Sequence, residues 1–225
     1  MDFYEFIMKP YQNSPLIIME AVGCFFGILS VYFSVKKNIW VYPTGIISTS
    51  AYTYILLKVG LIGDTLINMY YTIMSIYGWI LWAKNSSEED TVQVQWATKS
   101  DRLKAGILFF FSIMFVLFVY YLKPFIHPLS PSEKASPGLH HLDLANWLDI
   151  IVTAIFFVGM WLMAKRRIDN WLFWITGDLV SIPMYAYKGL GITMFQYCVF
   201  IIMAITGFYH WKKGAKKADP LMKGL

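Results

Sequence analysis

Charged residues are scarce in this chain of 225 residues and make up only 15% of it. An ordinary soluble domain carries roughly 25%, whereas 57% of the residues here are apolar and 18% are aromatic. Cysteine is scarce too: Cys24 and Cys198 both lie inside apolar runs, so a disulfide framework is not indicated. The shortage of charge indicates that lipid, rather than water, is the main solvent of the chain.

The apolar residues gather in long runs. A membrane-spanning helix needs about 20 mostly apolar residues, and the alternating strands of a transmembrane barrel do not run this long without interruption. Seven candidate spans result, at residues 15–35, 39–57, 61–82, 104–122, 143–164, 171–187 and 190–211. The sequence therefore predicts an all-α membrane protein with seven transmembrane helices in a single domain, 1–225.

The basic residues between the spans are distributed unevenly. With the N-terminus outside, fourteen lysines and arginines fall on the cytoplasmic side and five on the outer side. The positive-inside rule then predicts an N-out, C-in orientation, with residues 84–102 as a cytoplasmic loop. Because the net charge of +5 is spread over short clusters between apolar runs, it indicates membrane loops and no nucleic-acid partner.

The first three spans resemble the last three in the same direction. One register, which we call the asparagine register, aligns Asn38 with Asn170, Gly27 with Gly159, Thr44 with Thr176 and Gly45 with Gly177. A second, the tryptophan register, aligns Trp82 with Trp211, Gly60 with Gly189, Gly78 with Gly207 and Lys84 with Lys213. The pattern predicts two parallel three-helix repeats, 15–82 and 143–211, joined by a linker helix, 104–122. Such repeats meet at a central interface where a solute binds and is exposed to each side in turn.

Polar side chains inside the spans mark a candidate binding site. A charged or amide group that faces lipid costs a few kcal/mol, so such groups normally face the bundle interior or a cavity. The candidates are Glu20, Asn68, Tyr71, Asp149, Trp171, Trp174, Asp178 and Gln196. The competing interpretation is that polar groups bond to one another and hold the helices together, and that Trp171 belongs to an interfacial aromatic belt.

Within the sixth span, Trp174 and Asp178 share one helix face with Trp171. In the asparagine register the first repeat has Tyr42 in place of Trp174 and Ile46 in place of Asp178. Aromatic faces and amides suit a flat heteroaromatic ring that carries a sugar. A polyanionic ligand would need a cluster of Lys or Arg inside the spans, and none exists there, so a phosphorylated nucleotide is disfavoured.

Other function classes lack the residues they need. A retinal protein requires a lysine deep in the last span, and none lies between Gly189 and Trp211. The histidines, which an intramembrane enzyme or a metal site would use, lie at span ends or in loops, namely His127, His140, His141 and His210. The sequence therefore predicts neither an enzyme nor a bound metal or cofactor.

Four segments resemble the PnuC vitamin transporters, specifically the nicotinamide riboside transporters of bacteria. The segments are KKNIWVYPTGI (36–46), NMYYTIMSIYGWILW (68–82), NWLFWITGDLVSIPMYAYKGL (170–190) and FQYCVF (195–200). They occur in the family's order and include a Trp-x-x-Trp in the sixth span. The resemblance covers roughly residues 15–213.

The resemblance implies a 3+1+3 helix plan like that of the SWEET sugar transporters and a location in the bacterial inner membrane. It implies facilitated diffusion of unphosphorylated nicotinamide riboside, an NAD precursor, trapped by a cytosolic kinase. The family's motifs fall on Trp171 and Trp174, on Asn68 and Tyr71, and on Gln196. Transport of thiamine, riboflavin or a deoxynucleoside, ion coupling, and assembly into a homo-oligomer stay open at this point.

Overall fold

The computed structural model describes residues 17–59, 62–84, 94–126, 138–140, 142–187 and 191–218. Within these residues the chain forms seven α-helices and no strand. The helices are α2 (Ile17–Val35), α3 (Val41–Val59), α4 (Ile62–Lys84), α5 (Lys99–Ile126), α6 (Leu144–Ala164), α7 (Asn170–Tyr187) and α8 (Gly191–Ala218). The predicted all-α fold with seven helices is confirmed.

Two helices extend more than two residues beyond the predicted spans. α5 begins at Lys99 rather than at residue 104 because Thr98 and Asp101 cap it reciprocally. The Asp101 N–H donates to Thr98 Oγ1 (3.1 Å), and the Thr98 N–H donates to Asp101 Oδ2 (3.0 Å), which satisfies two backbone donors at the helix start. α8 continues past residue 211 to Ala218 in about two lysine-rich turns, which a search for apolar runs leaves out.

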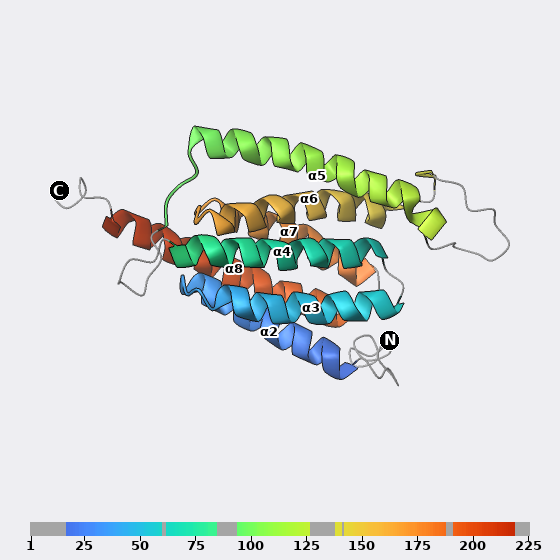
Figure 1. Ribbon diagram of the computed structural model, residues 1–225, viewed down its shortest axis with the longest axis horizontal. Helices are drawn as coiled ribbons and strands as arrows, with labels where there is room; N and C mark the ends of the chain where they lie inside the picture. Colours follow the sequence, from blue (N-terminus) through green and yellow to red (C-terminus); the bar gives the residue numbers. More distant parts are fainter. Residues whose placement is uncertain are drawn as a thin grey trace.

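The helices pack as two groups of three. α2, α3 and α4 pack against one another in chain order and form the first three-helix group, while α6, α7 and α8 form the second. The groups meet where α2 contacts α8 and where α4 contacts α6. α5 lies on the outside, along α6 (Figure 1). α6 is therefore covered on several sides, and most of its residues are buried.

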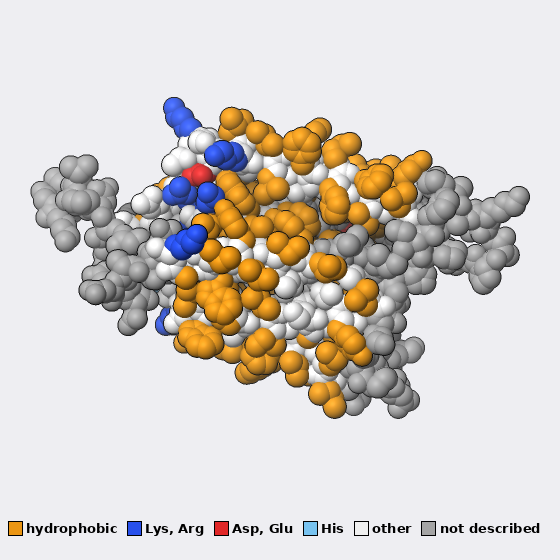
Figure 2. Space-filling view, in the orientation of Figure 1, with side chains coloured by type: hydrophobic (Ala, Val, Ile, Leu, Met, Phe, Trp, Pro, Cys, Tyr) orange, Lys and Arg blue, Asp and Glu red, His pale blue; other side chains and the backbone are white. Residues whose placement is uncertain are grey.

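The outer surface is apolar. Large apolar side chains are exposed along α5, among them Phe110 (59%), Phe111 (64%) and Phe118 (59%). Figure 2 shows hydrophobic side chains over the flank of the bundle, and Lys and Arg side chains gathered at the end where α5 begins. Of the described helices, α2, α5, α6 and α8 are long and apolar enough to cross a membrane by length and composition alone. A surface of this kind is suited to lipid.

The turns α2–α3 and α6–α7 have the same hydrogen-bond pattern. Lys37 (φ 57°) and Arg166 (φ 59°) are both left-handed, and their N–H groups donate to Ser34 O (3.0 Å) and Met163 O (2.9 Å). This αL residue after a helix end is a common helix C-cap.

The bonds of these two turns determine which residues of the two halves correspond. Each backbone bond donated within residues 36–42 has a counterpart donated within residues 165–171, and every pair follows the tryptophan register. The asparagine register, which was predicted for this part of the repeat, is therefore wrong here. Tyr42 corresponds to Trp171 rather than to Trp174.

Candidate binding cavity

A cavity of about 200 Å³ lies between the two three-helix groups. Side chains of α2, α3, α4, α6, α7 and α8 line it, whereas no α5 residue does. Cavities for drug-sized ligands measure roughly 300–1,000 Å³. The cavity therefore suits one small solute in the middle of the bundle, and α5 lies outside the site.

The first three-helix group contributes small and hydroxyl-bearing residues to the cavity. We call this surface the hydroxyl wall; it consists of Gly27, Ser30, Ser34, Gly45, Ser48, Thr49 and Ser75. Ser30 Oγ–H donates to Val41 O (2.7 Å) and Ser48 Oγ–H donates to Gly23 O (2.7 Å), so both hydroxyls join α2 to α3. Because the side chains are short, the backbone of this group comes close to the cavity.

The second three-helix group contributes aromatic rings. Trp174 stacks on Phe156 (ring centroids 5.3 Å apart), and Tyr197 lies nearly parallel to Phe156 at 6.1 Å. Tyr185 continues the series by stacking on Tyr197 at 5.1 Å. Trp174, Phe156 and Tyr197 all line the cavity. We call this surface the aromatic wall. It offers flat faces to a planar ligand, as hydrophobic and aromatic sites for small molecules commonly do.

Asp178 is the one charged residue among those that line the cavity. It lies one turn beyond Trp174 on α7 and is 2% exposed. Within the described part of the chain its carboxylate has no hydrogen bond or ion pair. A buried carboxylate without a partner is costly, and such groups in membrane spans commonly mark solute pathways.

The cavity brings together four of the eight predicted site residues: Tyr71, Trp171, Trp174 and Asp178. Gln196 borders it, because its Nε2 lies 3.5 Å from the position of a Cβ on Gly27. The Gln196 side chain accepts a hydrogen bond from Tyr52 Oη (3.3 Å), which links α8 to α3. A role of these five residues in binding stays a prediction.

The other three predicted residues are not among the lining residues. Asp149 is buried and accepts a 2.6 Å hydrogen bond from Tyr120 on α5, the interhelical bonding that the competing interpretation describes. Glu20 is half-buried near the start of α2, and Asn68 is half-buried on α4, one turn before Tyr71. Conversely, the prediction omitted Phe156 and Tyr197, because the sequence does not show which of the many aromatic residues in the spans face a site.

Four aromatic side chains fill the end of the bundle where α2 and α6 finish. Tyr42, Trp82, Trp171 and Trp211 are each at most 2% exposed, and we call them the aromatic plug. Tyr42 packs edge-on against Trp82 (5.1 Å), Trp171 packs edge-on against Trp211 (5.5 Å), and the two pairs meet where Trp82 lies 6.1 Å from Trp211. Each three-helix group thus contributes two rings to the plug.

Two glycines make the plug fit. A Cβ on Gly78 would overlap the Tyr42 ring, and a Cβ on Gly207 would overlap the Trp171 ring. These two glycines also correspond in the tryptophan register. Any larger residue would therefore force the rings apart, since packed interiors tolerate little additional volume.

Hydrogen bonds at the same end join the two three-helix groups. Trp211 Nε1–H donates to Ser34 O (2.8 Å), and Arg166 Nη2 donates to Leu81 O and Trp82 O (both 3.1 Å). Partial burial lowers the pKa of the Arg166 guanidinium, which nevertheless stays charged at neutral pH. The arginine thereby satisfies backbone carbonyls at the C-terminal end of α4, where a cation is favoured.

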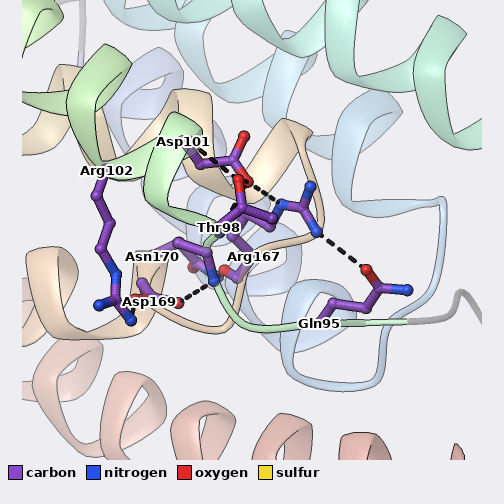
Figure 3. A network of polar contacts seen from close by, with 8 residues as sticks. Gln95, Thr98, Asp101, Arg102, Arg167, Asp169 and Asn170 are labelled. Atoms are coloured by element: carbon purple, nitrogen blue, oxygen red, sulfur yellow. Dashed lines mark hydrogen bonds and ion pairs between the residues drawn. The ribbon is translucent and has the colours of Figure 1, made fainter.

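A polar network attaches the segment before α5 to the α6–α7 turn (Figure 3). Arg167 Nε lies 2.9 Å from Asp101 Oδ2, and Arg167 Nη1 donates to Gln95 Oε1 (3.2 Å). The Ala97 N–H donates to Asp169 Oδ2 (2.7 Å). This network has no equivalent in the described residues at the α2–α3 turn, so it distinguishes the second half of the chain from the first.

A lipid-facing bundle of helices around a small central cavity, tightly packed at one end, defines a membrane protein that transports small solutes. The model of a family described as nicotinamide mononucleotide transporter matches residues 17–213. The chain belongs to this family. It is thus a multi-pass transporter of the bacterial inner membrane rather than an enzyme.

Individual relatives are distant but similar over most of their length. The nicotinamide riboside transporter PnuC of Escherichia coli is 22% identical over 207 residues, which cover 88% of this chain and 87% of that protein. The riboflavin/roseoflavin transporter RibM of Streptomyces davaonensis is 21% identical and covers 93% and 92%. A crystal structure of the vitamin B3 transporter PnuC superposes with a TM-score of 0.66 at 21% identity, covering 94% of this chain and 86% of that one. The fold is therefore that of PnuC.

Proposed function

We propose that the chain transports unphosphorylated nicotinamide riboside by facilitated diffusion. The observation that carries the proposal is the composition of the cavity, which combines an aromatic wall, a hydroxyl wall and a single carboxylate. The relatives named as nicotinamide riboside transporters support the same substrate.

The pyridinium ring of nicotinamide riboside is flat and positively charged. The face of an indole attracts such a cation by about 0.5–2 kcal/mol, and Trp174 presents its ring at the cavity. Asp178 lies on the same helix face and supplies the opposite charge. A neutral ring system would leave this buried carboxylate uncompensated, so the site favours a cation over the larger, uncharged riboflavin ring.

A phosphate group does not suit the cavity, although the family description names the mononucleotide. No Lys or Arg is among the lining residues, and phosphate sites in proteins normally supply cations or clustered backbone N–H groups. Asp178 would also repel a phosphate at short range. The site therefore supports the riboside rather than the mononucleotide.

Alternating access between the two three-helix groups is the mechanism that the packing supports. If the groups are parallel repeats, α2, α3 and α4 correspond to α6, α7 and α8, and the contacts α2–α8 and α4–α6 are equivalent. Rocking about this interface would expose the cavity to each side in turn. If the orientation is N-out and C-in, the aromatic plug lies at the cytoplasmic end, and the structure would then correspond to a state closed to the cytoplasm.

Uniport requires no coupling ion. The lining residues include one carboxylate and no second acid or base, so they supply no chain of groups for proton transfer. Net uptake then depends on the concentration gradient of the riboside, and a cytosolic kinase would maintain this gradient by phosphorylating the riboside.

The test is uptake by purified protein in liposomes. Nicotinamide riboside should enter down its own gradient at the same rate with and without proton or sodium gradients, while nicotinamide mononucleotide should not enter. Empty liposomes measure the leak, and thiamine, riboflavin and a deoxynucleoside complete the panel. Riboside flux that disappears when the ion gradients are collapsed would refute uniport, and flux of riboflavin alone would refute the proposed substrate.

A further inference from the structure

The two walls of the cavity are formed by equivalent positions of the two halves. In the tryptophan register that the turns establish, the corresponding pairs are Gly27 and Phe156, Gly45 and Trp174, and Ser75 and Ala204. In each pair the first half lacks the apolar side chain that the second half carries. At these three positions the two sides of the cavity differ in chemistry, whereas Tyr71 and Phe200 supply aromatic rings from both halves. A ligand therefore meets small and hydroxyl-bearing residues mainly on the first side.

The hydroxyls of the first side face the ligand mainly as acceptors. The hydroxyl groups of Ser30 and Ser48 donate hydrogen bonds to Val41 O and Gly23 O, both at 2.7 Å. A hydroxyl whose proton is used in this way still has lone pairs for another donor. Such oxygens accept hydrogen bonds from an O–H group, whereas they offer no donor to a phosphate or carbonyl oxygen.

Ser75 has an unused hydroxyl at the same place. It is 2% exposed, lines the cavity, and has no hydrogen-bond partner within the described residues. A Cβ on Gly45 would lie 3.4 Å from Ser75 Oγ and 3.1 Å from Ser30 Oγ. Two hydroxyl oxygens from α2 and α4 thus converge on the empty side-chain position of Gly45 on α3.

On the basis of the proposed function, we propose that the hydroxyl wall recognises the sugar of the solute. Ser30, Ser48 and Ser75 accept or share hydrogen bonds with the hydroxyl groups of a pentose, while the ring lies against the aromatic wall. Gly45 lets α3 approach Ser30 and Ser75 closely, so that both hydroxyls border the cavity beside the sugar. The chemical class of ligand is a planar cationic ring joined to an unphosphorylated pentose.

Deoxy analogues of the riboside test this assignment directly. The affinities of nicotinamide riboside and of its 2′-deoxy and 3′-deoxy analogues are measured by calorimetry on the purified full chain. The wild type should bind the riboside about 3- to 10-fold more tightly than at least one analogue, the effect of one hydrogen bond between neutral groups. Ser75→Ala should reduce that preference to about 1, because the acceptor of the missing hydroxyl is gone.

Gly45→Ala supplies an independent variant, since it places a methyl group between two hydroxyls without removing either. It should weaken riboside binding at least about 10-fold. Its effect on 1-methylnicotinamide, which has the cationic ring but no sugar, should be smaller. Ser112→Ala, a buried serine of α5 away from the lining residues, is the matched control and should leave every preference unchanged.

The outcomes separate the two proposals. Riboside binding by the wild type with an unchanged preference for the hydroxyls in Ser75→Ala, Ser30→Ala and Ser48→Ala would refute the sugar assignment alone. Equal weakening of riboside and 1-methylnicotinamide by Gly45→Ala would also refute it, because the methyl group would then act on the ring or the fold. A wild type that binds no riboside would refute the proposed function together with the assignment.

Discussion

Replacing Asp178 by asparagine tests the electrostatic basis of substrate choice. The substitution keeps the shape of the side chain and removes the one charge among the residues that line the cavity. Two unit charges about 5 Å apart interact by about 3 kcal/mol at an effective dielectric constant of about 20. Because Asp178 is 2% exposed, solvent screens this interaction little.

Part of that energy offsets the removal of the cation from water, so we expect a loss of about 1.5–3 kcal/mol. Asp178→Asn should therefore bind nicotinamide riboside about 10- to 150-fold more weakly. The reduced form, dihydronicotinamide riboside, has nearly the same shape without the charge. Its affinity should stay the same or increase, because the variant has no buried charge that a neutral ligand would leave without a counter-charge.

Calorimetry with both ligands on wild type and variant gives the four affinities of a complete cycle. Asp143→Asn is the matched control: it removes a carboxylate outside the cavity, at the N-cap of α6, where asparagine caps as well as aspartate does. It should change neither affinity. Equal losses for the charged and the neutral ligand in Asp178→Asn would refute the electrostatic reasoning and assign the carboxylate a structural role.

Three further substitutions test other parts of the structure. Trp174→Ala should weaken riboside binding by about 2- to 30-fold and Trp174→Phe by less, measured by calorimetry; unchanged affinity would contradict an aromatic wall that binds the ring. Gly207→Ala should displace the Trp171 ring from the plug and destabilise this packing by about 1–3 kcal/mol. A cysteine introduced at the cavity should then be labelled faster from the cytoplasmic side, and unaltered labelling would contradict a closing role of the plug. Arg167→Gln should lower the thermal unfolding midpoint by about 2–4 °C per kcal/mol lost, and a further Asp101→Asn change should add little, because the two side chains form one pair.

The helices of this protein could be predicted from the sequence because a long apolar run that crosses lipid must satisfy its own backbone hydrogen bonds. Runs of about 20 apolar residues have few alternatives to a helix in a membrane, and the predicted spans differ from the observed helices mainly where a polar turn extends them. α5 shows the limit: its start at Lys99 depends on the Thr98–Asp101 cap, which lies outside the apolar run.

The site was only partly predictable, for a physical reason. Polar residues in spans are conspicuous, so Asp178 and Tyr71 could be proposed from the sequence, and the structure brings both to one cavity. The sequence could not tell whether a buried carboxylate faces a cavity or a neighbouring helix, and Asp149 bonds to Tyr120. Phe156 could not be predicted for the opposite reason. In an apolar run an aromatic residue resembles its neighbours, and only the structure shows that it lines the cavity.

The register of the repeat was predicted incorrectly around the α2–α3 turn. Asn38 and Asn170 are identical in type, and matching them produced the asparagine register. The turns, however, follow the tryptophan register, so Asn38 corresponds to Arg167. An alignment by residue type matched the two asparagines although their backbone positions differ. Only the hydrogen bonds of the turns distinguish the two registers.

The aromatic plug also makes the molecule its own optical reporter. Trp82, Trp171 and Trp211 are buried together, with ring centroids 5.5 and 6.1 Å apart for the neighbouring pairs. Separation of the two three-helix groups at this end would hydrate these indoles and shift their fluorescence to longer wavelength. Other tryptophans, such as Trp40 and Trp147, are already exposed on the surface of the bundle and would contribute a constant background. Opening and closing should therefore be visible in solution without any attached dye.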